Sequence, residues 1–123
     1  MIPEKLIEVI KHEGVVSIVT MGKLKPHVVN TWNSYVTLTD ENHMLIPVGG
    51  MKVTEQNVLQ NNLLLLTLGS REVDGLRSKG TGFLIEAKGE FVNNGKHFIT
   101  MKSKYPWIRS VLVVKPISID QTL

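Results

Sequence analysis

Short extended runs follow one another through short turns along most of this chain, and this succession constrains the fold more than any other feature. Residues 15–20 read Val-Val-Ser-Ile-Val-Thr, and residues 63–68 are leucines broken by a single threonine. Runs of this length that are β-branched or apolar and bounded by turn residues are typical of strands. In residues 81–92, apolar and polar side chains alternate, which places them on opposite faces of a strand. Further strands are expected over residues 26–30, 35–39, 43–48 and 109–119.

Two or three short helices are expected beside these strands, the third of them at residues 97–105. They cover residues 3–13, a segment that starts with Thr54 as N-cap and ends near residue 61, and residues 97–105. Residues 69–80 are polar and rich in glycine, which predicts a loop. Six or seven strands joined by short turns favour an antiparallel barrel with helices packed outside it, and not parallel βαβ units. The length of 123 residues fits a single domain over residues 1–123.

Several kinds of catalytic chemistry lack their usual residues. The chain has no cysteine, and none of its four histidines stands at a spacing typical of metal ligands. The motifs of hydrolase nucleophiles, P-loops and Rossmann dinucleotide sites are also missing. An activity would therefore have to come from a bound cofactor.

Charge and hydropathy indicate where the protein works. The net charge of +3 comes from scattered lysines and arginines, which is weak evidence for binding nucleic acid. The chain opens on a charged amphipathic stretch, and its longest apolar run, residues 63–66, is too short to span a bilayer. We expect a soluble cytoplasmic protein that binds neither nucleic acid nor membranes.

Residues 30–35, Asn-Thr-Trp-Asn-Ser-Tyr, place four small hydrogen-bonding side chains around two large aromatic ones. On a strand, Trp32 shares a face with Asn30 and Ser34, while Tyr35 lies on the other face. Such a segment can offer polar groups to a phosphate and an aromatic wall to a flat ring. It can equally be the capped end of a strand with Trp32 in the core.

Two further segments have the same double interpretation. In residues 47–54, two glycines let the backbone approach a flat ligand, and a helix start follows that favours an anion. The alternative is a glycine turn before an ordinary N-cap. In residues 105–107, Trp107 follows a proline and could shield a planar ligand or cover the core.

Taken together, these segments resemble the small FMN-binding proteins of anaerobic bacteria, which belong to the split-barrel superfamily that includes the pyridoxamine phosphate oxidases. The similarity runs in the same order over almost the whole chain. The matching stretches are residues 13–16, 29–35, 47–51, 54–55, 67–71, 80–85 and 121–123.

The resemblance implies a six-stranded antiparallel split barrel and a homodimer with FMN at the subunit interface. It implies that Asn30 and Thr31 contact the phosphate or ribityl chain, with Lys52 and Thr54 near the phosphate. Trp32, Tyr35 and Trp107 would surround the ring, and the backbone around Gly49 and Gly50 would line its polar edge. Leu123 would cover the flavin of the other subunit. Ser34, Pro47 and Val48 are also expected among the residues that bind the cofactor.

One position departs from the family pattern. The family has a lysine directly before the threonine of the phosphate loop, whereas this chain has Val53 there and its lysine at Lys52. Thr54 and the helix start could still bind a phosphate, and Arg71 is another possible cation.

The implied role is electron transfer between redox partners, with a small redox protein as a possible partner. A carboxylate near the flavin would lower its potential, and Glu13 is the candidate, although it can also be a solvated carboxylate at a helix end. Two other functions remain open. One is a flavin-dependent oxidoreductase, either pyridoxamine phosphate oxidase-like or a flavin reductase, and the other is a basic barrel that stacks the bases of single-stranded nucleic acid.

Overall fold

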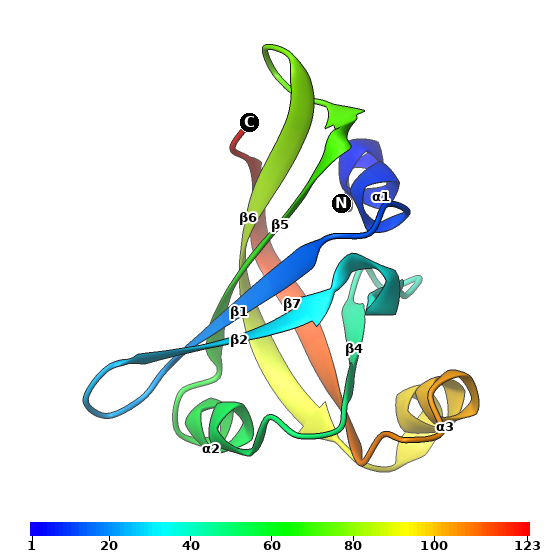
Figure 1. Ribbon diagram of the computed structural model, residues 1–123. Coiled ribbons are helices and arrows are strands. Elements are labelled where there is room, and N and C mark those ends of the chain that lie inside the picture. Colours follow the sequence, from blue (N-terminus) through cyan, green and yellow to red (C-terminus); the bar gives the residue numbers. More distant parts are fainter.

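The computed structural model describes residues 1–123 as one strongly curled antiparallel sheet with three short α-helices at its ends (Figure 1). The strands pair in the order β2-β1-β5-β6-β7-β4-β3, and the two edge strands are not hydrogen-bonded to each other. The elements are α1 (Glu4–Ile10), β1 (Val15–Met21), β2 (Pro26–Trp32), the 3₁₀ turn η1 (Asn33–Tyr35), β3 (Thr37–Leu38), β4 (Met44–Val48), α2 (Lys52–Gln60), β5 (Leu63–Asp74), β6 (Lys79–Val92), α3 (Gly95–Lys104) and β7 (Ser110–Gln121).

The expected fold class is confirmed. The chain is mainly β, the sheet is antiparallel throughout, and the barrel is left open, as in a split barrel. Six strands are long, and the seventh, β3, has only two residues. None of the helices is both long and apolar enough to cross a membrane.

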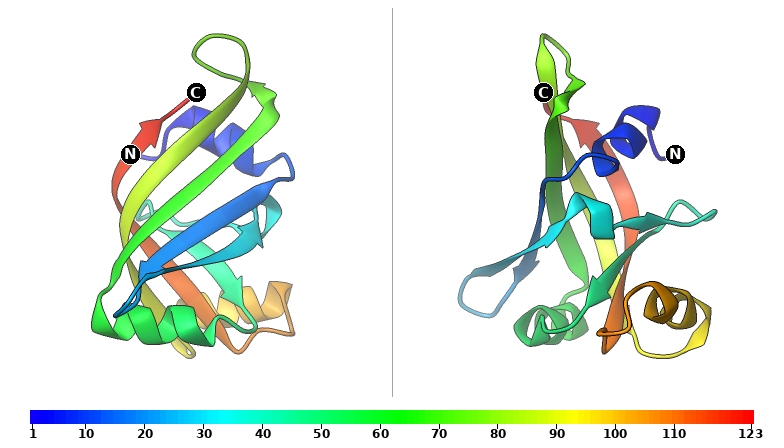
Figure 2. Two further views of the ribbon diagram at one scale, coloured as in Figure 1. Left: turned by 60° about the vertical axis from the view of Figure 1, so that its left-hand side comes forward. Right: turned by 45° about the vertical axis from the view of Figure 1, so that its right-hand side comes forward.

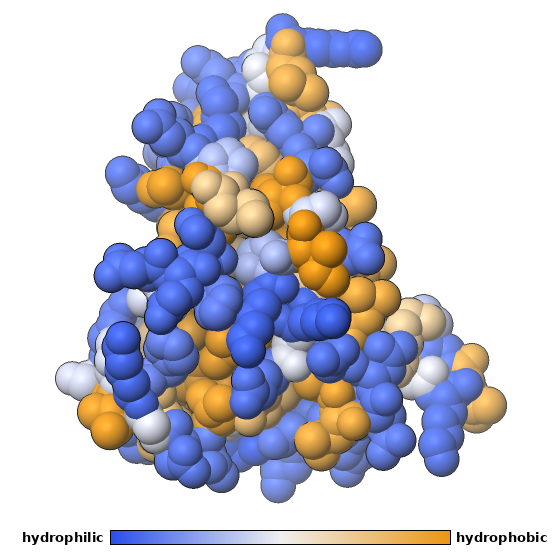
Figure 3. Space-filling model, turned by 180° about the vertical axis from the view of Figure 1, so that it is seen from behind, coloured by the Kyte–Doolittle hydropathy of each residue, from blue (hydrophilic) through white to orange (hydrophobic).

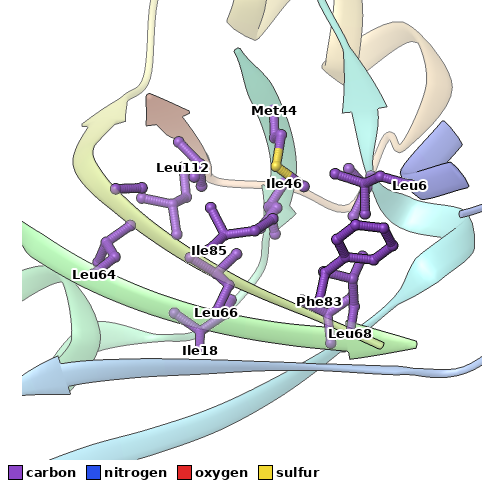
Figure 4. Packing of buried hydrophobic residues seen from close by; sticks show 14 of the residues in the cluster. Leu6, Ile18, Met44, Ile46, Leu64, Leu66, Leu68, Phe83, Ile85 and Leu112 are labelled. Atoms are coloured by element: carbon purple, nitrogen blue, oxygen red, sulfur yellow. The ribbon is translucent and has the colours of Figure 1, made fainter. Parts of the chain in front are cut away.

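One face of the curled sheet forms the core. Along β6 the side chains of Phe83, Ile85 and Ala87 are buried while their neighbours are exposed, as the alternation in the sequence predicts. Figure 4 shows Leu66, Ile85 and Ile46 pointing into the same interior from three different strands. Burying side chains of this size contributes about 1.5–3 kcal/mol each, so this interior is the main source of stability.

The leucine run is a strand, but only one of its faces is buried. Leu64, Leu66 and Leu68 lie in the core, whereas Leu63 and Leu65 are exposed on the outer face. The strand therefore carries apolar side chains on a surface that the monomer does not cover.

The prediction of a loop over residues 69–80 is correct only for residues 75–78 and is wrong for the strand residues on either side of them. β5 and β6 continue as a hydrogen-bonded pair to Asp74 and Lys79, and they form a long arm at the top of Figure 1. A Cβ on Gly69 would lie 2.5 Å from the carbonyl oxygen of Thr81, so glycine permits the close pairing here. The polar composition reflects an arm that extends into solvent, and not a lack of strand structure.

The helices lie at opposite ends of the sheet. α1 lies beside the β5–β6 arm, while α2 and α3 lie at the other end (Figures 1 and 2). The C-terminus lies near the arm, far from α2 and α3 (Figure 1). Seen from behind, apolar side chains on the surface alternate with charged ones and form no single continuous patch (Figure 3).

Candidate functional site

Three aromatic rings meet where η1 approaches the connection between α3 and β7. The ring centroid of Tyr35 lies 5.3 Å from that of Tyr105 and 5.8 Å from that of Trp107, and the last two rings are 5.8 Å apart. All three pairs are tilted or edge-on, an arrangement that aromatic quadrupoles favour. Burial and the neighbouring Tyr35 raise the pKa of Tyr105. We call these three rings the aromatic cluster.

The glycine loop after β4 packs directly against this cluster. A Cβ on Gly49 would lie 3.3 Å from ring atoms Cε3 and Cζ3 of Trp107, so the indole rests on bare backbone. The backbone N–H of Arg109 donates to the carbonyl of Val48 at 2.9 Å, and its Nη2 donates to the carbonyl of Gly50 at 2.6 Å. The loop is thus held against β7 by one arginine.

The same guanidinium connects the loop to α2. Nη2 of Arg109 lies 2.9 Å from Oε1 of Glu55, in the first turn of the helix. Both side chains are about two-thirds buried, so this ion pair is better shielded than a fully exposed one. The aromatic cluster, the glycine loop and the start of α2 therefore form one connected structure.

The start of α2 has hydrogen-bond donors without protein partners. The residue before the helix, Met51, has a left-handed φ of 57°, and its side chain does not cap the helix. The first N–H groups of a helix have no acceptor within it. Thr54 is fully buried, and its hydroxyl has no hydrogen-bond partner. Lys52 is exposed and makes no ion pair.

The expectation that Thr54 caps this helix is wrong. The helix begins at Lys52, which places Thr54 inside the first turn and not in front of it. Met51 adopts a left-handed conformation, which turns the chain into the helix at Lys52. Because this conformation is uncommon for residues other than glycine, the sequence pattern does not indicate so early a start.

The residues at the end of β2 are divided between two faces. Thr31 is buried opposite Val16, whereas Asn30 and Trp32 lie on the outer face opposite Ser17 and Val15. Trp32 is 46% exposed and is not a member of the aromatic cluster. The prediction that it shares a strand face with Ser34 is wrong, because the strand ends and η1 begins at Asn33.

Asn33 is a structural residue at the centre of this segment. Its buried amide Nδ2 donates to three carbonyls, those of Val9 at 3.3 Å, His12 at 2.9 Å and Gly69 at 3.1 Å. The side chain thereby ties the end of α1 and the β5 strand to η1. It accounts for part of the polar character of residues 30–35 without any ligand.

Glu13 and Ser34 form an exposed hydrogen-bonded pair beside Asn33. The Ser34 hydroxyl donates to Oε2 of Glu13 at 2.7 Å, and the Ser34 N–H donates to Oε1 at 3.2 Å. These bonds, with a weaker one from the N–H of Gly14, hold the pKa of Glu13 below its usual range. Tyr105 also reaches this segment, since its hydroxyl donates to the Ser34 carbonyl at 3.4 Å.

Leu123 lies elsewhere in the molecule. It lines a hollow of about 690 Å³ between the segment that follows α1 and the β5–β6 arm. Glu13 and Arg71 also line this hollow, but no residue of the aromatic cluster or of α2 does so. Arg71 is therefore not placed to act at the start of α2 within one chain.

The structure brings together a large part of the predicted set. Ser34, Tyr35, Val48, Gly49, Gly50 and Trp107 are linked through the contacts above, and Lys52 and Thr54 follow in α2. Pro47 and Val48 are buried on β4, where they pair with β7, so they can present only backbone. Arg109 was missed, because nothing in its sequence neighbourhood shows that it faces Gly50 and Glu55.

Comparison with solved structures identifies the class of fold to which the chain belongs. HupZ of Group A Streptococcus matches 99% of this chain and 94% of its own, with a TM-score of 0.81 and 14% identity. An FMN-binding protein from Syntrophomonas wolfei subsp. wolfei matches 98% of this chain and 85% of its own, with a TM-score of 0.73 and 15% identity. Identities this low show the fold alone, and they define the class as that of split-barrel proteins.

Sequence comparison is more specific. No protein-family model matches the chain. The FMN-binding protein of Nitratidesulfovibrio vulgaris (strain Miyazaki F) is 46% identical over 123 residues, which cover the whole of both chains. The chain belongs to the family of this FMN-binding protein, as the motifs in its sequence imply.

Proposed function

We propose that this chain binds FMN non-covalently, in a site that two copies of the chain complete together, and carries electrons between redox partners. The start of α2 is the observation that carries this proposal. It combines unpaired helix N–H groups, the buried and unpartnered hydroxyl of Thr54 and the free ammonium of Lys52 beside the aromatic cluster.

The phosphate end of the proposed site follows from these donors. A helix N-terminus attracts anions through its N–H groups and its dipole. A buried hydroxyl without a partner costs about 1–3 kcal/mol, which a bound phosphate oxygen would offset. Lys52 supplies the side-chain charge in our proposal, since Arg109 is already paired with Glu55. The valine at position 53 then needs no direct role.

The ring end follows from the aromatic cluster and the glycine loop. Trp107 and Tyr35 present apolar ring surface to a planar group, and the backbone at Gly49 and Gly50 can approach its polar edge because no side chain intervenes. Trp32 and Asn30 would contribute from the end of β2. Bound FMN would supply the capacity to accept and release one or two electrons. The protein's part is to hold the ring, fix its orientation and limit its contact with water.

A second copy is proposed for two reasons. The outer face of β1, β5 and β6 exposes apolar side chains that the monomer does not cover, namely Val15, Leu63, Leu65 and Leu84, with Trp32 on the adjacent β2. Exposed apolar groups of this kind often mark protein interfaces. In addition, Leu123 lies at the opposite end of the sheet from α2, so it can cover a flavin only if that flavin is held by a partner.

The proposal is tested with FMN and with riboflavin, which lacks the phosphate. Titration of the purified protein should show FMN binding more tightly than riboflavin, and sedimentation should show a dimer. The flavin emission should be quenched when bound and should recover in Trp107→Ala, with Trp32→Ala as the parallel variant for the β2 side. Equal affinity for the two flavins, or no uptake of either, would contradict the proposed site.

A second measurement distinguishes an electron carrier from a flavin-dependent enzyme. We expect the FMN-loaded protein to exchange electrons with a small redox protein and to turn over neither NAD(P)H nor pyridoxamine phosphate. Steady turnover of either compound would instead support the flavin-dependent oxidoreductase.

A further inference from the structure

The lysines and arginines form no run in the sequence, but acidic residues are absent from one part of the chain. Residues 91–119 contain five lysines or arginines and no aspartate or glutamate, whereas the rest of the chain has nine basic and eleven acidic residues. The net positive charge therefore comes from this segment, which contains α3 and most of β7. Such a charge separation orients a molecule as it approaches a charged partner.

Three of these five basic residues lie on α3, namely Lys96, Lys102 and Lys104. All of the ion pairs in the structure are made by other residues. Glu41, in the turn before β4, faces the start of the helix. Its pKa is lowered by its own backbone N–H and by the Thr39 hydroxyl, and less strongly by Lys96 and the neighbouring histidine. The positive charge at the other end of α3 is left without a carboxylate partner.

Two of the lysines are held in place beside the aromatic cluster. Nζ of Lys104 donates to the hydroxyl of Thr37 at 2.9 Å and lies 5.7 Å from the centre of the Tyr105 ring, within the range of a cation–π interaction. Nζ of Lys102 donates to the carbonyl of Ile108 at 2.8 Å. Both charges therefore have fixed positions next to the rings that we propose for flavin binding.

Apolar side chains are exposed among these charges. Ile99 is 69% exposed and Trp107 is 52% exposed, and Pro106 is exposed beside the indole. On the helix, Ile99 shares a face with Lys96. We call Ile99, Pro106, Trp107 and the three lysines of α3 the α3 surface. A small apolar centre with a polar rim is typical of surfaces that bind protein partners.

The α3 surface is not covered by the rest of the chain or by the proposed second copy. α3 packs against β4, β6 and β7 through its inner side, where Met101 is fully buried. It lies on the opposite side of the molecule from the β1–β2 hairpin (Figure 1). The second copy is proposed to cover the outer face of β1, β5 and β6, so a different protein can reach α3.

The position of the α3 surface indicates the kind of partner. Electron transfer slows steeply with distance, so a carrier has to meet its partner close to its cofactor. Trp107 belongs both to the aromatic cluster and to the α3 surface, and a protein docked there would lie at the edge of the flavin site. Fixed positive charges select a partner that carries negative charge around its own cofactor.

We propose that the α3 surface is the docking surface for an acidic one-electron redox protein. This inference rests on the proposed function. In each encounter one electron leaves the reduced partner, which is oxidised, and enters the FMN, which is reduced. A second encounter completes the reduction, and the protons that the reduced flavin takes up come from solvent. The lysines orient the partner, while Ile99 and Trp107 contact it.

The test measures electron transfer with the FMN-loaded protein by stopped-flow absorbance. One probe is a reduced plant-type [2Fe–2S] ferredoxin, an acidic low-potential donor of one electron. The probe of opposite charge is a basic ferric cytochrome c, which accepts one electron from the reduced flavin. Lys96→Glu reverses an exposed charge of the α3 surface that makes no side-chain hydrogen bond. Lys23→Glu is the matched control, since Lys23 is exposed at the tip of the β1–β2 hairpin and the net charge changes equally.

We expect the ferredoxin rate constant to fall about tenfold between ionic strengths of about 0.01 M and about 0.15 M, because the Debye length shrinks from about 30 Å to about 8 Å. At the lower ionic strength, Lys96→Glu should slow ferredoxin about fivefold and speed cytochrome c, whereas Lys23→Glu should change either rate less than about twofold. Ile99→Ser should slow ferredoxin about threefold at both ionic strengths, because it removes a contact and not a charge.

Equal effects of Lys96→Glu and Lys23→Glu would overturn the docking surface, since net charge alone would then account for the rates. Tight binding of a fluorescent oligothymidylate that is lost in Lys96→Glu would also overturn it, because the α3 surface would then be one for nucleic acid. FMN affinity should be the same in both lysine variants and in the unchanged chain. The proposed function fails separately, if the unchanged chain takes up no FMN.

Discussion

Asn33 and Thr54 are both fully buried polar residues with an oxygen that has no hydrogen-bond partner, yet their surroundings differ. The amide nitrogen of Asn33 donates to three backbone carbonyls, so most of its hydrogen-bonding capacity serves the fold. The hydroxyl of Thr54 makes no hydrogen bond at all and lies at the start of a helix whose N–H groups are also uncapped. Burial of a polar group alone does not distinguish a structural residue from a binding residue, whereas the complete set of its partners does.

The largest expected effect on stability comes from replacing Asn33, the structural residue of the two. Asn33→Ala should lower the free energy of unfolding by about 3 kcal/mol, because it leaves carbonyls of α1 and β5 without their donor. Urea denaturation should show a lower midpoint with the same slope. Asn62→Ala is the control, since Asn62 is exposed and its side chain makes no hydrogen bond. Equal effects of the two changes would mean that Asn33 does not hold the segments together.

The second prediction concerns Thr54, which we propose binds the phosphate. Thr54→Val should leave stability unchanged or raise it slightly, because the lost hydroxyl has no partner. FMN affinity should fall about tenfold, the value expected for one hydrogen bond to a charged group, while riboflavin affinity stays the same. Isothermal titration with both flavins measures this difference. A loss of stability with no change in FMN affinity would make Thr54 a structural residue like Asn33.

The smallest effect on stability is expected for Glu13 and Ser34, the exposed hydrogen-bonded pair beside Asn33. The hydrogen bonds from Ser34 lower the pKa of Glu13 in the folded state. Its contribution to stability is therefore present above the unfolded pKa of about 4.3 and is lost as pH falls through the folded value. Glu13→Gln should melt slightly below the unchanged protein at pH 7, and the difference should shrink towards pH 3. A difference of the same size at pH 7 and at pH 3 would contradict this role of the Ser34 hydrogen bonds.

The same Glu13 variant tests a redox effect independently. If FMN binds near this carboxylate, removing the negative charge should raise the midpoint potential of the holoprotein. An unchanged potential would leave Glu13 with only its surface hydrogen bonds to Ser34.

Strands and helices were predictable where the signal is local. The alternation in residues 81–92 identifies the buried face of β6, and the β-branched run identifies β1 to within a residue. The prediction failed for most of the β5–β6 arm, because its strand structure comes from pairing between the two strands, such as Gly69 with Gly82 and Asp74 with Lys79. A polar, glycine-rich composition looks the same in a loop and in a solvated two-stranded arm.

The candidate site was predictable as a set of segments but not as an arrangement. The stretches at residues 30–35 and 47–54 were found because their residue types fit a phosphate and a flat ring. Their polar residues could not be assigned to structure or to binding, since that depends on which backbone groups the fold brings near. Asn33 illustrates this, because its three acceptors come from segments 21 to 36 residues away.

The sequence by itself determined the mainly β antiparallel class, most element positions and the family to which the chain belongs. These follow from local side-chain pattern and from residue types in order, which need no knowledge of distant contacts. Only the tertiary structure decided that Arg109 joins Gly50 to Glu55, that Thr54 is left without a partner and that Lys104 reaches the hydroxyl of Thr37. Each of these depends on strand register and helix placement, through which residues far apart in the chain come within hydrogen-bond distance.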